Sequence, residues 1–182
     1  MSSSVQAQDR VERFEALVMP HVDSAYNLAR WMTRNASDAE DIAQEALLRA
    51  FRFFETFRGD DARVWLLTIV RNTYLTWIRR QMPLQNSAEF DEGLHTDLED
   101  AVTPESALLK QTRSQEIRQA IEQLPAEYRE VILMRELEQL SYKEIAAITR
   151  SPLGTVMSRI SRARSLLRNR MRSQAAEVQQ HD

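Results

Sequence analysis

Apolar and polar residues alternate along most of this chain with the 3.6-residue period of an α-helix. Runs of alternating β-branched residues are few, and the chain holds three glycines, so the predicted fold class is all-α. Ser37 and Glu40 have the spacing of a capping box at the start of one helix. The helices predicted before Ser141 lie at about residues 8–33, 38–56, 62–81, from Thr103-Pro104 to Leu124, and 126–138.

The last third predicts two short helices separated by a tight turn. Ser141 and Glu144 form a second capping box, and Ser151 followed by Pro152 predicts the N-cap and the first position of the second helix. The second helix has one apolar face, which consists of Val156, Ile160, Ala163 and Leu167. This layout predicts a helix-turn-helix at about 141–164, whose second helix would lie in a DNA major groove.

Basic charge is concentrated in the same segment. Residues 141–172 hold eight basic residues and one acid, whereas the whole chain has a formal net charge of −3. Arginine forks match guanine edges and phosphates. Because arginine-rich helix ends are common, the charge alone leaves a solvated or partner-packing helix equally open. The cap, the turn, the apolar face and the charge together favour DNA binding.

Composition excludes several classes of function. The 182 residues contain no cysteine, which excludes disulfides, thiol catalysis and cysteine-ligated zinc and suits a reducing cytoplasm. The three histidines, His21, His95 and His181, lie far apart, so we predict no metal and no cofactor. The first residues lack the pattern of a signal peptide, and we expect no membrane insertion.

An acidic stretch interrupts the helical pattern. Residues 81–105 hold seven acids, no lysine or arginine, and two of the five prolines. We therefore predict two small helical domains, at residues 8–81 and 105–172, joined by a flexible acidic linker at 82–104. The polar tail from Ser173 is expected to be frayed.

The first predicted domain carries an acidic helix face. Asp41, Glu45 and Arg49 are spaced by four residues, and Asp38 and Gln44 lie nearby. On its own this pattern favours an ordinary solvated face, since surface ion pairs are common and weak.

A basic and aromatic segment follows that face. Seven of the thirteen aromatic residues lie between Phe51 and Trp77, and residues 62–80 contain four arginines and no acid. Such a surface suits the phosphates and unpaired bases of a single strand. Taken singly, each aromatic residue, including Phe51 and Phe54, is predicted to lie in the core. A core role does not explain the arginines or the polar Asn72.

These pieces, in this order, resemble bacterial RNA polymerase sigma factors of the small, two-domain extracytoplasmic-function group. The resemblance spans about residues 10–170. Its matching segments are Asp-Ala-Glu-Asp-Ile-Ala-Gln-Glu at 38–45, Phe-Arg-Gly-Asp at 57–60, Trp-Leu-Leu-Thr-Ile-Val-Arg-Asn at 65–72, Leu-Pro-Ala-Glu-Tyr-Arg-Glu at 124–130, Leu-Ser-Tyr-Lys-Glu-Ile-Ala at 140–147, and 154–164.

The resemblance implies an alternative sigma factor, with no catalysis of its own, that binds core RNA polymerase, directs it to promoters and nucleates melting. It further implies a cytoplasmic protein of the stress response, controlled by an anti-sigma factor. The acidic linker would thread the RNA-exit and active-site channel. The acidic helix face would bind the clamp helices of the largest subunit through Asp38, Asp41, Gln44, Glu45 and Arg49.

The resemblance also assigns two DNA-binding surfaces. The minus-ten element and its melted strand would be bound by Arg58, Gly59, Asp60, Asp61, Ala62, Arg63, Arg71, Asn72, Trp77, Arg79 and Arg80. The minus-thirty-five element would be bound by Thr155, Met157, Ser158, Arg159, Ser161, Arg162 and Arg164.

The chain departs from the family pattern at three places. Arg150 stands at a turn position that usually carries glycine, and it costs stability if that position needs φ > 0. Thr76 replaces a frequent aspartate, and the loop after Asp60 is one residue shorter than in many members.

Two other readings of the residues remain. An ordinary helix-turn-helix regulator would bind a palindrome as a dimer without polymerase. A helical adaptor would use its arginine face to bind an acidic protein. An enzyme ranks last, because the sequence shows no nucleophile–base set, phosphate loop or metal-ligand spacing.

Overall fold

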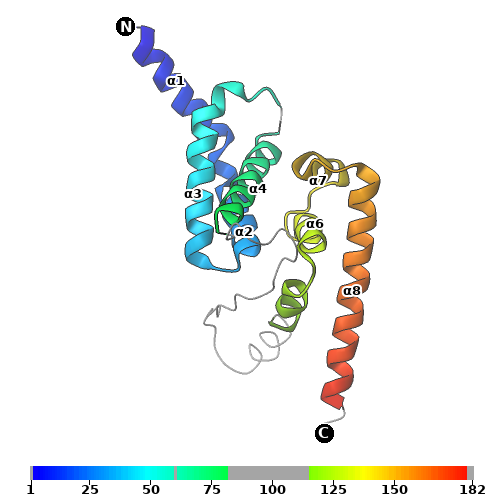
Figure 1. Cartoon of the computed structure of the whole chain (residues 1–182). Helices are drawn as coiled ribbons and strands as arrows, with labels where there is room; N and C mark the ends of the chain where they lie inside the picture. The colour runs from blue at the N-terminus through cyan, green and yellow to red at the C-terminus, as the bar shows by residue number, and fades with distance from the viewer. Residues whose placement is uncertain (1, 60, 82–114, 180–182) are drawn as a thin grey trace. The chain divides into compact units, whose positions relative to one another are not determined.

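The computed structural model describes residues 2–59, 61–81 and 115–179, and within them it contains helices and no strands (Figure 1). The predicted all-α fold class is confirmed. The chain divides into two compact units, one built on residues 1–91 and the other on most of residues 92–182. The acidic linker predicted at 82–104 and the start of the helix predicted from Thr103-Pro104 lie outside the described residues.

The first unit is a bundle of three mutually packed helices, α2, α3 and α4, preceded by α1 (Figure 1). Small residues dominate the buried faces of α2 and α3, which lets the helix axes approach closely: Ala25, Ala29, Ala39, Ala46 and Ala50 are fully buried. The elements in chain order are α1 (Ser2–Leu17), the 3-10 turn η1 (Met19–His21), α2 (Val22–Thr33), α3 (Ala36–Phe53), the 3-10 turn η2 (Phe54–Thr56) and α4 (Ala62–Gln81).

The single helix predicted at 8–33 is wrong, because the structure interrupts it at Pro20. Proline has no N–H to donate, and its ring clashes with the carbonyl one turn earlier. The chain therefore makes the turn η1 there, in which the His21 N–H donates to the Val18 carbonyl at 3.0 Å. The helix before the break also begins earlier than predicted, at Ser2.

The start of α3 corrects the predicted capping box at Ser37 and Glu40. The N-cap is Asn35, whose Oδ1 accepts the Asp38 N–H at 3.1 Å. Asparagine caps a helix as well as serine does, so the helix begins two residues earlier and places Ser37 inside its first turn.

The second unit contains a helical stretch at 115–122, followed by α6 (Ala126–Glu136), α7 (Tyr142–Thr149) and α8 (Leu153–Gln179). Helices α6 and α8 pack against each other. Val156, Ile160 and Ala163 form the buried stripe of α8, as predicted, and Leu167 is half-buried. Within the described residues, none of the helices combines the length and the apolarity that a bilayer crossing needs.

Three details of the second unit differ from the prediction. The helix predicted at 126–138 ends at Glu136, because Gln139 turns the chain with φ 53°. Helix α8 begins one residue later than expected, since the Pro152 carbonyl accepts the first helical bond, from Val156. It also continues to Gln179, so the frayed tail from Ser173 is wrong; alanine, glutamine and glutamate in this tail favour helix.

Two predictions about the helix-turn-helix are confirmed, one at the start of α7 and one in the turn between α7 and α8. Ser141 and Glu144 cap α7 reciprocally: the Glu144 N–H donates to Ser141 Oγ at 3.2 Å, and the Ser141 N–H donates to the Glu144 carboxylate. Arg150, at the turn, has φ 51°, the left-handed conformation that favours glycine. Arg150 is therefore in a strained backbone conformation, as expected if this position, which usually carries glycine in the family, needs a positive φ.

Candidate nucleic-acid interface

The seven residues predicted for the minus-thirty-five element all lie in the first half of α8. Ser158, Ser161 and Arg162 are exposed on the side away from the buried stripe of Val156 and Ile160. Met157 and Arg164 are also exposed, whereas Thr155 and Arg159 are half-buried. The helix therefore presents hydroxyls and one arginine at its centre, a set that can bond to base edges in a major groove.

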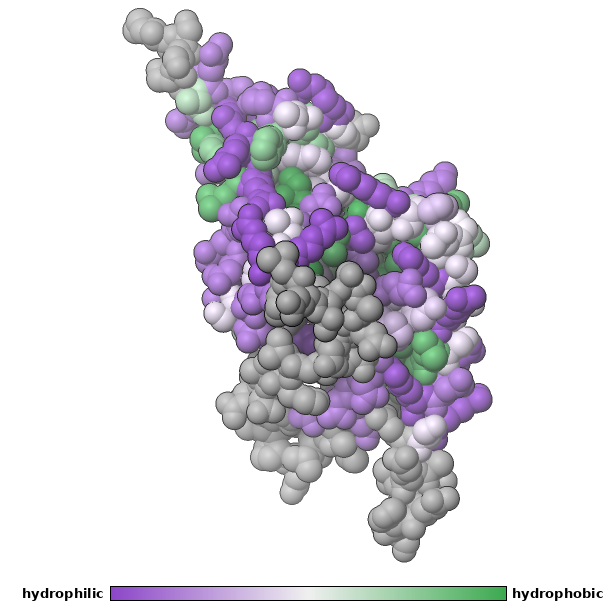
Figure 2. Space-filling model, in the orientation of Figure 1, coloured by the Kyte–Doolittle hydropathy of each residue, from purple (hydrophilic) through white to green (hydrophobic). Residues whose placement is uncertain are grey.

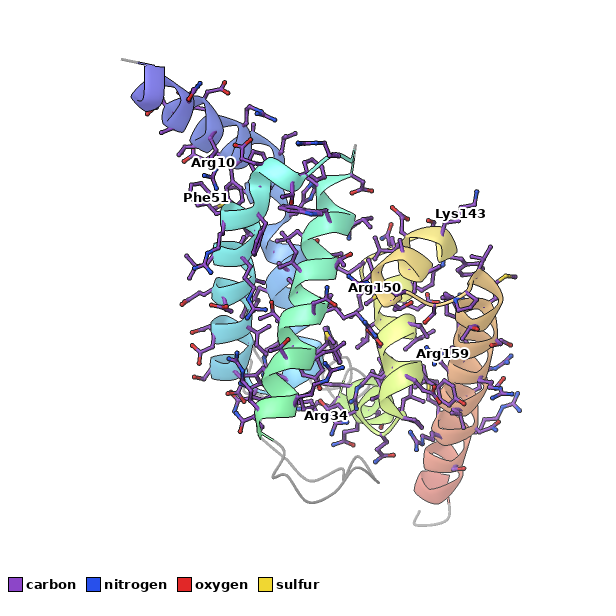
Figure 3. The ribbon with its side chains drawn as sticks, turned by 45° about the horizontal axis from the view of Figure 1, so that its top comes forward. Arg10, Arg34, Phe51, Lys143, Arg150 and Arg159 are labelled. Carbon is purple, nitrogen blue, oxygen red and sulfur yellow. The ribbon has the colours of Figure 1, made fainter. Side chains whose placement is uncertain are left out.

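Two arginines of α8 are held by the first turn of α6. Arg159 Nη2 lies 3.0 Å from the Glu127 carboxylate, and Arg162 Nη1 lies 3.4 Å from the Tyr128 hydroxyl (Figure 3 labels Arg159). The contact with Tyr128 raises the pKa of Arg162. These contacts fix the directions of both guanidinium groups before any ligand is bound, which lowers the entropy cost of binding.

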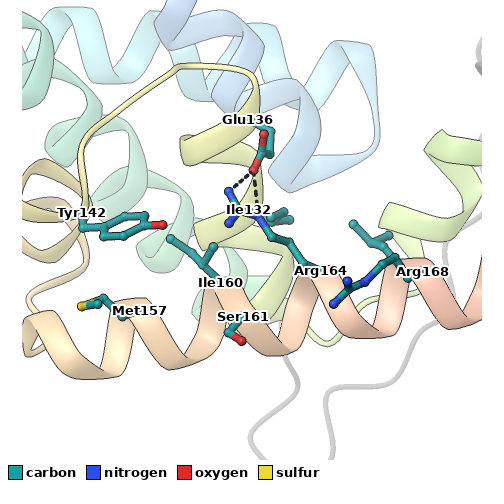
Figure 4. Close-up of a pocket in the computed structure, with 9 residues that line it drawn as sticks. Ile132, Glu136, Tyr142, Met157, Ile160, Ser161, Arg164 and Arg168 are labelled. Carbon is teal, nitrogen blue, oxygen red and sulfur yellow. Dashed lines mark hydrogen bonds and ion pairs between the residues drawn. The ribbon is translucent and has the colours of Figure 1, made fainter.

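Arg164 makes a stronger contact with α6. Its Nη2 and Nε donate to the same Glu136 oxygen at 2.7 and 3.2 Å (Figure 4). This hydrogen bond raises the pKa of Arg164. Because the carboxylate neutralises it, Arg164 offers less charge to DNA than its sequence position suggested.

The Arg164–Glu136 pair spans an open groove of about 690 Å³ between α6 and α8 (Figure 4). Tyr142, at the start of α7, and the exposed Met157 also line it. The remaining lining is mostly apolar, with Ile132, Ile160, Leu167, Ser161 and Arg168. The groove adjoins the recognition face of α8 and shares Met157, Ser161 and Arg164 with it.

The acidic face of α3 is exposed, as both an ordinary solvated face and a docking surface require. Asp41, Gln44 and Glu45 point to solvent, and Arg49 Nε donates to Glu45 at 2.6 Å. Asp38 is half-buried beside the helix cap. The structure therefore brings the five predicted residues onto one helix and pairs two of them.

Sequence reasoning missed Leu48 on the same helix. This side chain is 64% exposed, one turn beyond Gln44 and Glu45. An apolar residue on the polar face of an amphipathic helix was the available signal. A lone exposed leucine needs no explanation, but one beside a candidate docking strip extends that strip with an apolar contact.

The loop between η2 and α4 carries the first of the residues predicted for the minus-ten element. Arg58 and Gly59 are exposed, and Arg58 Nη1 donates to the Glu55 carbonyl at 2.6 Å. Asp60 lies outside the described residues. Asp61 caps α4 by accepting the Val64 N–H at 2.9 Å. The next residue, Ala62, is buried.

The predicted residues on α4 are divided between faces of the helix. At 100° per residue, Asn72 and Arg79 share a side, whereas Arg63 lies opposite Asn72. Trp77 is half-buried and stacks on Tyr74, with ring centroids 6.1 Å apart. Arg71 is half-buried, and Arg80 is exposed near the helix end. One strand can therefore contact only part of this set at a time.

The aromatic residues before α4 divide between core and surface. Phe54 is 2% exposed, in agreement with the core prediction, and Trp65 is half-buried. The prediction that Phe51 is core is wrong: its ring is 37% exposed and lies beside Arg10 (Figure 3). Figure 2 shows apolar side chains at the surface in this region, where α1 meets the end of α3.

Comparison with protein families identifies both halves of the chain. Residues 17–83 match the family model for sigma-70 region 2, and residues 114–167 match the model for sigma-70 region 4. The chain is 38% identical over 175 residues to the RNA polymerase sigma-H factor of Pseudomonas aeruginosa, covering 89% of this chain and 90% of that one. It is 39% identical over 153 residues to the ECF RNA polymerase sigma-E factor of Haemophilus influenzae, covering 79% of each.

Solved structures share the fold. The sigma factor RpoE from Bartonella quintana, in complex with the anti-sigma factor NepR, superposes with a TM-score of 0.68 over 88% of this chain and 98% of that one, at 23% identity. CnrH, in complex with the cytosolic domain of CnrY, gives a TM-score of 0.63 over 92% of this chain and 94% of that one, at 24% identity.

Proposed function

We propose a division of labour for this chain, which belongs to the sigma-70 family as an alternative sigma factor of the extracytoplasmic-function group. As such a factor it directs RNA polymerase to promoters and has no catalytic activity of its own. In the proposed division, the first unit binds the core enzyme and the minus-ten element, and the second unit binds the minus-thirty-five element.

The observation that carries the assignment of the second unit is the exposed face in the first half of α8. Ser158, Ser161 and Arg162 lie opposite the buried stripe of a capped helix-turn-helix. In the proposed complex these three side chains reach base edges. Arg159, held by Glu127, and Arg164, held by Glu136, contact phosphates and fix the register of the helix.

The exposed strip on α3 supports the assignment of core binding. Asp41, Gln44 and Glu45 offer carboxylate and amide oxygens in a row, and Leu48 adds an apolar contact. A basic, helical surface with an apolar position fits this strip, and the clamp helices of the largest polymerase subunit are the proposed partner. Electrostatic complementarity of this kind speeds association and fixes register.

The loop after η2 and the side of α4 that carries Asn72 are assigned to the minus-ten element. Opening a duplex costs about 1–2 kcal/mol per base step, and stacking one base on an aromatic ring returns about 1–3 kcal/mol. In the proposed complex Arg58, Asn72 and Arg79 bind the strand while a base stacks on an aromatic ring such as that of Trp77. Capture of one or two bases then helps to nucleate melting, and contacts in the polymerase supply the rest.

Regulation by a protein partner is also part of the proposal. Two solved structures of the same fold are complexes, one of the sigma factor RpoE with the anti-sigma factor NepR and one of CnrH with the cytosolic domain of CnrY. We expect this chain to act in the cytoplasm under similar control.

Three substitutions test the division of labour: Glu45→Lys, Asn72→Ala and Arg162→Ala. Each is assayed for binding of core polymerase and, as holoenzyme, for binding of a minus-ten single strand and a minus-thirty-five duplex. We expect Glu45→Lys to bind core polymerase more weakly. Asn72→Ala and Arg162→Ala should bind core as the wild type does, and as holoenzymes they should lose affinity for the minus-ten strand and for the minus-thirty-five duplex, respectively. Glu40→Lys, an exposed charge change on the same helix, is the control for Glu45→Lys. A variant that loses a different activity contradicts the assignment of its surface.

A further inference from the structure

Helix α1 reaches the end of α3 through Arg10 and Phe14. Arg10 Nη2 donates to the carbonyl oxygen of Phe51 and, at 3.4 Å, to that of Arg52. The last carbonyls of a helix lack intrahelical partners and attract positive charge. Arg10 therefore adds hydrogen bonds from outside α3 at its end, where the Phe51 carbonyl also accepts the Phe54 N–H.

The same guanidinium group has two further partners. Its Nε lies 3.6 Å from the Glu55 carboxylate, and its central carbon lies 4.7 Å from the centroid of the Phe51 ring (Figure 3). Glu55 belongs to η2, the turn that leads from α3 to the loop. Arg10 thus joins α1 to both sides of the junction between α3 and η2.

Phe14 extends this contact to the loop by way of aromatic rings. Its ring, 7% exposed, meets those of Phe51 and Phe54 edge to face at 5.1 and 5.3 Å. Phe54 stacks on Phe57 at 6.3 Å, and Phe57 contacts Trp65 of α4 at 5.1 Å. A continuous series of rings therefore connects α1 with Phe57, the residue that precedes Arg58.

Arg58 closes the turn from the other side. Its Nη1 donates to the carbonyl oxygens of Glu55 and Phe57, at 2.6 and 3.3 Å. Glu55 thus forms an ion pair with Arg10 at 3.6 Å, longer than a hydrogen bond, and its carbonyl accepts a hydrogen bond from Arg58. The direction in which the chain leaves η2 depends on both arginines.

We propose that Arg10 is a positioning residue for promoter melting: by donating to the end of α3 and pairing with Glu55, it sets the direction in which Arg58 and Gly59 meet the unpaired minus-ten strand. The inference rests on the proposed function of this loop. Arg10 contacts no DNA itself, and it acts through η2.

The test uses holoenzyme assembled from core polymerase and the full chain. The probe is a fluorescent oligonucleotide with the non-template minus-ten sequence of a promoter that the wild-type holoenzyme transcribes. We expect Arg10→Gln to bind this probe about tenfold more weakly, since it loses charge-assisted hydrogen bonds to two carbonyls. Arg10→Lys, which keeps the charge but loses the fork, should recover part of that affinity.

Glu15→Gln is the matched control, because it removes an exposed charge from the same helix. It should bind the probe as the wild type does. All three tryptophans lie in the first unit, so the urea midpoint of tryptophan fluorescence reports the folding of that unit alone. Core binding and minus-thirty-five affinity should be unchanged in each variant.

Two results overturn the inference while leaving the proposed function intact. One is an unchanged probe affinity in Arg10→Gln. The other is a loss of core binding that accompanies the loss of probe affinity, which means that Arg10 merely keeps the unit folded. If the wild-type holoenzyme itself does not prefer the minus-ten strand over a scrambled strand, the proposed function of the loop fails, and the inference fails with it.

Discussion

The loop before α4 and the recognition helix α8 are held in place by different interactions. Aromatic rings from α1, η2 and α4 support the loop around the buried Phe54. Ion pairs to α6 support α8, through Arg159 with Glu127 and Arg164 with Glu136. In both pairs the side chains remain between 28% and 53% exposed.

The two kinds of support respond differently to their surroundings. Ring contacts in a core depend on shape and are nearly indifferent to salt. Exposed ion pairs contribute little to stability and are screened by salt, so their main effect is on side-chain direction. We infer that ring packing keeps the loop of the first unit in place by stabilising the unit. In the second unit the ion pairs mainly fix the directions in which the arginine side chains point.

The largest expected effect is on the aromatic side of this comparison. Phe54→Ala should lower the free energy of unfolding of the first unit by about 3–5 kcal/mol, since it leaves a cavity at a side chain that is 2% exposed. Urea unfolding followed by tryptophan fluorescence measures it. The adjacent Phe53, 52% exposed, is the control, and Phe53→Ala should cost less than about 1 kcal/mol. Equal losses would show that the ring cluster does not support the unit.

The next effect concerns DNA recognition by α8. Arg162→Ala should weaken binding at one guanine-containing position of the minus-thirty-five element roughly 5- to 150-fold, the value of one bidentate base contact. Holoenzyme affinity for a series of singly substituted promoters measures it. If the loss is the same on every sequence, Arg162 contacts phosphate and the specific reading lies with Ser158 and Ser161.

Backbone strain in the turn before α8 gives a smaller effect. Arg150→Gly should raise the free energy of unfolding of the helix-turn-helix by about 0.5–1 kcal/mol, because glycine adopts φ 51° without a steric cost. Circular dichroism in urea, recorded in a background with Phe54→Ala so that the first unit unfolds earlier, separates the two transitions. A destabilised variant would mean that the Arg150 side chain contributes more than its backbone costs.

The smallest effect is expected for the ion pair across the groove. A double-mutant cycle of Arg164→Gln and Glu136→Gln should give a coupling of about 0.2–1 kcal/mol at low salt that declines at high salt. Promoter affinity should fall more than stability does, since the pair orients Arg164. A coupling that is large and independent of salt would contradict the claim that the ion pairs between α6 and α8 add little stability.

Local patterns in the sequence predicted much of the fold. The capping box at Ser141 and the stripe of Val156, Ile160 and Ala163 depend on residues a few positions apart, and both are confirmed. The errors arose where two signals competed. Pro20 lies within an otherwise continuous helical pattern, and Asn35 precedes a serine of equal capping strength.

The candidate surfaces were less predictable, because their arrangement depends on residues far apart in the chain. Glu136 lies 28 positions before Arg164, and Arg10 lies 41 positions before Phe51. No sequence periodicity links residues that far apart. Arg164 was therefore predicted to be available to DNA, and no contact was predicted for Arg10, whereas in the structure Arg164 pairs with a carboxylate and Arg10 donates to carbonyls at a helix end. Leu48, which is 64% exposed, was overlooked although its place on the polar face of α3 was a local signal in the sequence.

Run-off transcription with purified core polymerase, on promoters that differ only in the spacing of their two elements, tests the central claim most directly. If each unit binds its own element while polymerase holds both, a transcript should require the chain and the native spacing. It should disappear when the spacing changes by about five base pairs, half a helical turn. Equal transcription at both spacings would contradict the claim that the two units bind separate elements at a distance set by the polymerase.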